Sequence, residues 1–213
     1  MNLPDKFRYV VVEGPIGAGK TSLARRIAEH CDVTALLETP EENPFLASFY
    51  QDRRRYALPT QLFFLFQRAR QLEGLTQMEL FKQVIVADFL IEKDPLFARV
   101  TLNDDEFRLY QEVFKHLRPQ TATPDLIVYL QAPPAVLYER VKRRGHRYER
   151  NLSEDYLSLI ADHYHRFFYQ YDSAPLLIVN SANLNFVDES QDFELLLKRI
   201  DSMRGQREFF SKG

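Results

Sequence analysis

The stretch "EGPIGAGKTS", residues 13–22, constrains the fold of this chain more than any other feature. It follows the apolar run "YVVV", precedes the helical segment "LARRIAEHC", and fits the pattern G-x-x-x-x-G-K-[ST]. In such a loop, backbone N–H groups and the positive end of the following helix form a phosphate site. A chance glycine-rich turn is the alternative, which the flanking strand and helix disfavour. We therefore expect a nucleotide-binding loop, the P-loop, with phosphate contacts from Gly14, Pro15, Ile16, Gly17, Ala18, Gly19, Lys20, Thr21 and Ser22.

Along the rest of the chain, short apolar runs rich in branched residues alternate with longer helical segments, which indicates an α/β protein. Strands are expected at residues 9–12, 34–37, 84–87, 126–130 and 176–179. The length of 213 residues, 45% of them hydrophobic, suffices for a single domain spanning residues 1–213. We expect a three-layer α/β sandwich of the P-loop NTPase type, with a five-stranded parallel sheet and ligands at the carboxyl ends of the strands.

The charge and apolar pattern limit the partners. A formal net charge of -2 gives no basic field of the kind a nucleic-acid-binding protein uses. Cys31 is the one cysteine, so no internal disulfide can form, and the N-terminal sequence has no secretion signal. No apolar run approaches the roughly 18 residues of a membrane span. We expect a cytoplasmic protein with neither nucleic acid nor membrane as a partner.

Acidic residues close two of the predicted strands, Glu38 in "TALLE" and Asp88 in "VIVAD". Because the carboxyl ends of neighbouring parallel strands meet at one edge of a sheet, both should lie beside the P-loop. We expect Thr21 and Asp88 to hold a magnesium ion, Lys20 to contact the terminal phosphates, and Glu38 to orient a hydroxyl and take its proton. A strand-end turn residue is the alternative for each acid, and spacing alone does not decide between them.

A basic segment, "RVKRRGHRYER", occupies residues 140–150. Arg140 and Arg144 are four residues apart and hence on one helix face. In a P-loop protein such a segment suits a lid that neutralises charge on the transferred group, although a solvated basic helix end is the alternative. We expect an arginine-rich lid here, with Arg140 at the nucleotide and Arg144 and Arg147 at the group being transferred.

Five stretches together resemble the deoxyribonucleoside kinase family, including its bacterial members, over nearly the whole chain. They are "EGPIGAGKTS", "LLETPEENPF", "YALPTQLFFLFQRAR", "RVKRRGHRYERNLSEDYL" and "LNFVDESQDFELLLKRI". The resemblance implies a kinase of nucleotide salvage that transfers the γ-phosphoryl group of ATP to the 5'-hydroxyl of a deoxynucleoside. It further implies Mg²⁺ with ATP as the cofactor, a homodimer, and a preference for purine deoxynucleosides or deoxycytidine.

The resemblance also implies roles on the substrate side. Glu38 would be the base for the 5'-hydroxyl, and Tyr50 and Glu149 would hold the sugar 3'-hydroxyl. Tyr50 would also leave little room for a 2'-hydroxyl. An ordinary half-buried tyrosine is the alternative reading of Tyr50.

For the nucleobase, the resemblance implies that Gln61, Arg68 and Asp94 contact the base edge. Gln61 and Arg68 are seven residues apart, two helical turns, so they should project from one helix face with Phe64 and Leu65 between them. Core packing explains part of "LFFLF", and a surface ion pair is the alternative for Arg68 and Asp94.

The chain departs from the family pattern after the third predicted strand and in the lid. Phe89 stands where most members carry an arginine, and His146 stands where an arginine often follows the lid glycine. Either change would lower activity or shift the role of the arginine to Arg144 and Arg147. Two other functions stay open: a nucleoside monophosphate kinase, with residues 53–55 ("RRR") gripping the acceptor phosphate, and a non-catalytic P-loop nucleotide sensor.

Overall fold

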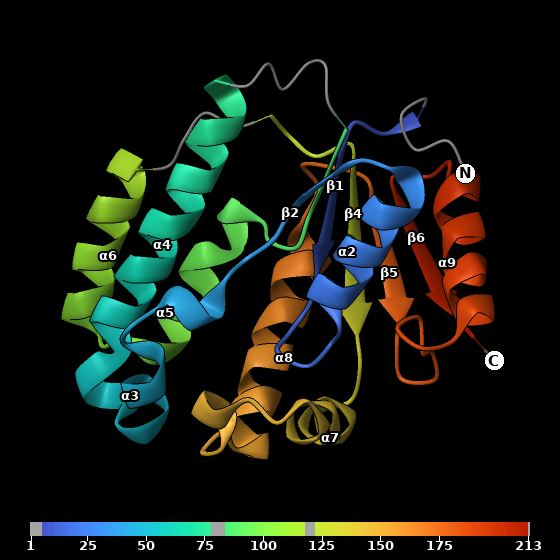
Figure 1. Ribbon diagram of the computed structural model, residues 1–213. Helices are drawn as coiled ribbons and strands as arrows, with labels where there is room; N and C mark the ends of the chain where they lie inside the picture. The colour runs from blue at the N-terminus through green and yellow to red at the C-terminus, as the bar shows by residue number, and fades with distance from the viewer. Residues whose placement is uncertain (1–5, 78–83, 118–121, 213) are drawn as a thin grey trace.

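The computed structural model describes residues 6–77, 84–117 and 122–212 (Figure 1). Within this part of the chain, six strands form one sheet in the order β2-β3-β1-β4-β5-β6, and every neighbouring pair is parallel. The strands are β1 (Tyr9–Glu13), β2 (Thr34–Leu36), β3 (Ile85–Ala87), β4 (Leu126–Gln131), β5 (Leu176–Asn180) and β6 (Arg207–Ser211). The predicted parallel α/β fold is confirmed, with the first five strands where they were expected.

The expected strand count of five was wrong, because the C-terminal segment forms β6 at the edge of the sheet. The sequence "REFFS" alternates weakly, since its two phenylalanines are adjacent. Phe210 packs against the core, whereas Phe209 is 67% exposed. Arg207 donates from Nη1 to the carbonyl oxygen of Phe168 at 3.0 Å, and Glu208 pairs with Arg199 at 2.6 Å. The pairing with β5 and the long-range contact of Arg207, rather than a local pattern, hold the edge strand.

Helices flank the sheet, as Figure 1 shows. They are α2 (Lys20–Cys31), α3 (Leu46–Gln51), α4 (Arg53–Gln77), α5 (Asp94–Thr101), α6 (Asp104–Leu117), α7 (Pro134–Arg144), α8 (Glu154–Gln170) and α9 (Ser190–Ser202), with short 3₁₀ turns η1 (Pro40–Glu42), η2 (Ile91–Lys93) and η3 (Arg147–Glu149). Pro134 occupies the first turn of α7, and Gly145, with φ 73°, ends it. Among the described helices, none is long and apolar enough to cross a membrane.

The core centres on β1 and β4, whose residues are almost all buried. Helix α8 packs on this part of the sheet through Phe168 and Tyr164, whose rings stack on Tyr129 of β4 with centroids 4.3 and 6.2 Å apart. Helices α3, α4, α5 and α6 gather on the side of the sheet beyond β2, and α7 lies near the end toward which the strands point (Figure 1). This arrangement leaves the carboxyl ends of β1, β2 and β3 facing α4 and the lid.

Candidate active site

The P-loop runs from the end of β1 to the start of α2. Gly17 and Gly19 have φ angles of 86° and 92°, in the left-handed region that side chains with a Cβ rarely adopt. A Cβ atom on Gly17 would lie 2.6 Å from the carbonyl oxygen of Leu137 in α7. The loop therefore needs glycine here, both for its turn and for its close contact with α7.

An open cleft of about 1230 Å³ lies over the P-loop. Its walls are the P-loop, α7 and residues 182–187. Arg140 lines this cleft and donates from Nη2 to the carbonyl oxygen of Ser181 at 2.5 Å, which ties α7 to the end of β5. Backbone N–H groups at a helix start, together with arginine side chains across the cleft, suit the phosphates of a nucleotide.

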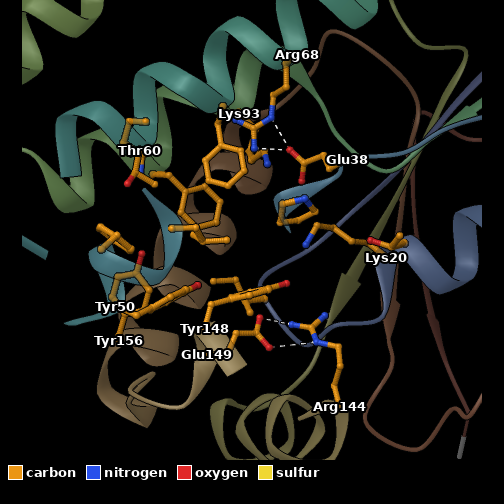
Figure 2. Close-up of a pocket in the computed structure, with 18 residues that line it drawn as sticks. Lys20, Glu38, Tyr50, Thr60, Arg68, Lys93, Arg144, Tyr148, Glu149 and Tyr156 are labelled. Atoms are coloured by element: carbon orange, nitrogen blue, oxygen red, sulfur yellow. Dashed lines mark hydrogen bonds and ion pairs between the residues drawn. The ribbon is translucent and has the colours of Figure 1, made fainter. Parts of the chain in front are cut away.

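A second, smaller cavity of about 120 Å³ lies between the P-loop and α4. Lys20 and Glu38 lie on one side of it, and Tyr50 and Tyr156 lie on the opposite side (Figure 2). Arg144 lines both this cavity and the open cleft. Ligands bound in the two spaces would therefore approach each other beside the P-loop lysine and the lid arginine.

Glu38 lies two residues beyond β2 and faces the cavity. Arg68 donates from Nε to Glu38 Oε1 at 2.5 Å. Burial raises the pKa of Glu38, but the positive charges of Arg68, Lys93 and Lys20 outweigh it and lower this pKa to about 2. The carboxylate is thus ionised at neutral pH and can accept a proton from a hydroxyl placed in the cavity.

Asp88 directly follows β3, and its Oδ1 accepts the backbone N–H of Glu38 at 2.8 Å. The two acids therefore meet at one edge of the sheet, as the strand pattern predicts. Burial and the negative charge of Glu38 raise the pKa of Asp88 to about 6, while Thr21 and Lys20 act in the opposite direction. Asp88 Oδ2 is buried and has no hydrogen-bond partner among the described residues.

Arg68 of α4 joins two acids, because its guanidinium pairs with Glu38 and with Asp94 at the start of α5. Arg68 is 5% exposed and Asp94 is 1% exposed, so the pair is not a surface ion pair. Tyr110 of α6 donates from its hydroxyl to Asp94 Oδ2. Gln61 lines the same cavity two turns before Arg68, with Phe64 between them, whereas Leu65 is buried in the core.

Across the cavity, η3 and α3 supply a second polar wall. Glu149 is buried and forms a bidentate pair with Arg144, one bond of which, from Nε to Oε2, measures 3.2 Å. The rings of Tyr50 and Tyr148 stack with centroids 6.4 Å apart. Burial is the main cause that raises the pKa of Tyr50, and the charge of Glu149 adds to it. Tyr50 and Glu149, for which the resemblance implies a common role, thus share one side of the cavity.

The family model for deoxynucleoside kinases matches residues 10–203. The chain belongs to the deoxynucleoside kinase family. Members of this family are phosphotransferases that act on deoxynucleosides. The chain is 30% identical to the deoxyguanosine kinase of Bacillus subtilis over 200 residues, 92% of this chain and 97% of that one. It is 28% identical to the deoxyadenosine kinase of Lactobacillus acidophilus over 208 residues, 91% of this chain and 95% of that one.

Solved structures of a deoxynucleoside kinase have the same fold. The deoxyadenosine kinase from M. mycoides with the products dCMP and dCDP has a TM-score of 0.79 and 24% identity, and covers 91% of this chain and 99% of that one. The same enzyme with bound dATP has a TM-score of 0.77 and 22% identity, with the same coverage. The agreement in fold extends over nearly all of this deoxynucleoside kinase.

In the predicted kinase site, Arg147 and Asp94 line neither the cleft nor the cavity, and Asp94 contacts the cavity wall through its ion pair with Arg68. Arg147 is exposed on η3 and lines neither the cleft nor the cavity, because the turn at Gly145 presents Tyr148 and Glu149 to the cavity instead. The expectation that Arg147 acts beside Arg144 is therefore not met in this conformation. Phe89, which the resemblance places where most members carry an arginine, is completely buried in the core and contributes no polar group to this site.

Sequence reasoning missed several residues of this deoxynucleoside kinase that line the cavity, among them Lys93 and Thr60. Both are 1% exposed, and Thr60 Oγ1 has no hydrogen-bond partner among the described residues. The signal for Lys93 was its place in "FLIEKDPLF", where three charged residues interrupt an apolar run. Thr60 directly precedes Gln61, and nothing in the sequence distinguishes its hydroxyl from that of a surface threonine.

Proposed function

We propose that the protein transfers the γ-phosphoryl group of ATP to the 5'-hydroxyl of a deoxynucleoside in nucleotide salvage, with purine deoxynucleosides preferred and deoxycytidine second. The observation that carries this is the place of Glu38, an ionised carboxylate that lines the cavity on the same side as Lys20 of the P-loop. A nucleoside in the cavity with its 5'-oxygen at Glu38 would face a γ-phosphate held at Lys20. The relatives named deoxyguanosine kinase and deoxyadenosine kinase support this acceptor class.

Magnesium would enter with ATP, held on the protein side by Thr21 and Asp88. These residues fit the ion, because Asp88 offers a buried carboxylate oxygen without a hydrogen-bond partner in the described chain. A magnesium ion bound mainly by phosphates and water needs only one or two protein ligands. When bound, it would neutralise charge on the phosphate groups while Lys20 and Arg144 orient them.

The sugar side gives a first prediction: deoxyadenosine should be used with a kcat/KM at least about tenfold above that of adenosine. Tyr50 is 8% exposed and fixed between Phe49 and Tyr148, so a ring held in this place cannot move aside for a 2'-hydroxyl. Steady-state kinetics with both nucleosides checks this. Tyr50→Phe should raise KM for deoxyadenosine, whereas Tyr169→Phe, at a side chain that is 74% exposed, should not. Equal kcat/KM values for deoxyadenosine and adenosine would contradict the placement of Tyr50 at the sugar.

The nucleobase gives a second prediction: thymidine should be a poor acceptor, and Arg68→Met with Asp94→Ala should lower the deoxyguanosine-to-thymidine ratio of kcat/KM by about tenfold or more. A base that leaves buried charged groups without hydrogen-bond partners is disfavoured strongly. Arg68 and Asp94 are both buried here. The matched control is Arg99→Met with Asp104→Ala, which removes an exposed ion pair of 2.9 Å. Thymidine as the best acceptor of the unmodified protein would reject this assignment.

The structure bears on both other functions. Arg53 stacks over the Tyr156 ring at 4.0 Å, and neither it nor the exposed Arg54 and Arg55 lines the cavity. The ionised Glu38 would also repel an acceptor phosphate. These observations disfavour a nucleoside monophosphate kinase. A nucleotide sensor needs no proton acceptor beside the P-loop. Glu38 provides such an acceptor, which disfavours a sensor.

An acceptor panel tests the proposal. Purified protein, ATP and magnesium are incubated with each deoxynucleoside, ribonucleoside and nucleoside monophosphate, and ADP release and products are followed. The proposal predicts deoxynucleoside 5'-monophosphates, with purines first. Nucleoside diphosphates from monophosphates would instead favour the monophosphate kinase, and ATP binding without any product would favour the sensor.

A further inference from the structure

Lys93, at the end of η2, is a buried lysine that faces the cavity. Its side chain is 1% exposed, and its Nζ lies 3.2 Å from Glu13 Oε1. The ammonium also lies over the rings of Phe97 and Tyr164, at 5.2 and 5.9 Å from their centroids. Removing a positive charge from water this completely is costly unless partners compensate. The hydrogen-bond acceptors around the Lys93 ammonium therefore determine which role the residue can have.

The partner acid, Glu13, is already well supplied with hydrogen bonds. It is 0% exposed and accepts the N–H of Gly14 at 3.0 Å, the N–H of Leu90 at 2.8 Å and the hydroxyl of Tyr164 at 3.1 Å. Lys93 has three N–H donors, and Glu13 is the one acceptor that the described residues offer it. The ammonium thus keeps donor capacity on a side chain that lines the cavity.

Lys93 lies near the part of the cavity where Glu38 lies. Figure 2 shows Lys93 beside Arg68 and on the side of Glu38, away from Tyr50. Lys93 and Lys20 both contribute to the lowered pKa of Glu38, so both charges are felt at that carboxylate. Arg68 is engaged by two acids, whereas Lys93 is engaged by one. Beside Lys20 of the P-loop, Lys93 is therefore a second cation placed to donate to a new negative group near Glu38.

We propose that Lys93 is a catalytic residue, which donates hydrogen bonds to the nucleoside 5'-oxygen and to the γ-phosphoryl group during transfer. This rests on the proposed function. As the 5'-oxygen bonds to the γ-phosphorus, its proton passes to Glu38, and the bond from that phosphorus to the β,γ-bridging oxygen breaks, with ADP leaving. Lys93 keeps its own proton throughout and stabilises the negative charge on the 5'-oxygen and on the oxygens of the γ-phosphoryl group during transfer. It supplies a positive charge in a site where position 89 is an apolar core residue.

The competing role for Lys93 is a counterion that only neutralises Glu13. Two variants separate the roles, because Lys93→Met and Glu13→Gln both break the same ion pair, but only the first removes the ammonium. The proposal predicts that Lys93→Met lowers kcat by about 100-fold or more, with KM for ATP and deoxyguanosine changed by less than about threefold. Glu13→Gln should lower kcat by less than about tenfold, and Lys93→Arg should recover most of the loss. Thermal unfolding of each variant confirms that it is folded.

Equal losses of kcat in Lys93→Met and Glu13→Gln would overturn the proposal and leave Lys93 a counterion. Loss of nucleoside affinity alone would overturn it as well. Should the neutral variants not fold, crystals of the unmodified protein with ADP, aluminium fluoride and deoxyguanosine decide. A Lys93 Nζ within hydrogen-bond distance of the fluoride or the 5'-oxygen supports the proposal, and an Nζ bound only to Glu13 rejects it. An unmodified protein that phosphorylates no deoxynucleoside would instead refute the proposed function itself.

Discussion

Glu38→Gln should lower kcat by about 100-fold to 10,000-fold while KM for ATP and for the deoxynucleoside changes little. The amide keeps the shape of the side chain but cannot accept the 5'-hydroxyl proton. Lys20 and Arg144 would still position the phosphates, so a residual rate above zero is expected. Steady-state kinetics with deoxyguanosine measures the effect.

Glu38→Gln also removes one charge from the Arg68 cluster, so folding needs its own check. Arg68 keeps Asp94 as its partner, and the variant should therefore remain folded by thermal unfolding. The matched control is Glu41→Gln, three residues away on η1 at an exposed side chain, which should have unchanged kinetics. Near wild-type turnover in folded Glu38→Gln would refute the assignment of the base.

Arg144→Ala should lower kcat by about 100-fold to 1,000-fold, and more than it weakens nucleoside binding. Arg144 lines both the cleft and the cavity, so it lies where charge develops on the transferred group. Its substitution also releases the buried Glu149 from its ion pair, which should raise KM for the nucleoside modestly. Separate measurement of kcat and of KM distinguishes the two effects.

The lid offers matched comparisons for Arg144→Ala. Arg150→Ala, at an exposed side chain that lines neither space, should leave the kinetics unchanged. Arg147→Ala should have a much smaller effect than Arg144→Ala, because Arg147 is exposed in this conformation. If Arg144→Ala weakened only nucleoside binding and left kcat unchanged, the contact of Arg144 with the transferred group would be contradicted.

Local pattern predicts the strands of this fold wherever the pattern is strong. The runs that form β1 and β4 are apolar throughout, as expected of strands covered on both faces, and the P-loop fixes the turn between β1 and α2. Strand β6 escapes prediction because its five residues are stabilised by pairing with β5 and by the bonds of Arg207 to carbonyl oxygens of Phe168 and Tyr171, 39 and 36 residues away. Such contacts are absent from any short window of sequence.

The site residues likewise divide into those that local sequence predicts and those that depend on distant contacts. Glu38 and Asp88 were predicted from the ends of strands, because geometry over a few residues decides where they lie. Gln61 was predicted from the resemblance to the family, with which its spacing from Arg68 on one helix face agrees. The Glu38–Arg68 contact joins residues 30 positions apart, and the Lys93–Glu13 pair joins β1 to η2, so both depend on the complete fold. Arg147 shows the reverse case, since a basic run predicts a lid but not which arginine turns inward.

A crystal structure of the protein with ADP and deoxyguanosine tests the central claim most directly. We expect ADP in the open cleft with its phosphates on the P-loop, and the nucleoside in the cavity with its 5'-oxygen within hydrogen-bond distance of Glu38. The guanine should lie against Gln61, Arg68 and Asp94. A nucleoside bound outside this cavity, or bound in it with its 5'-oxygen turned away from Glu38, would contradict the account.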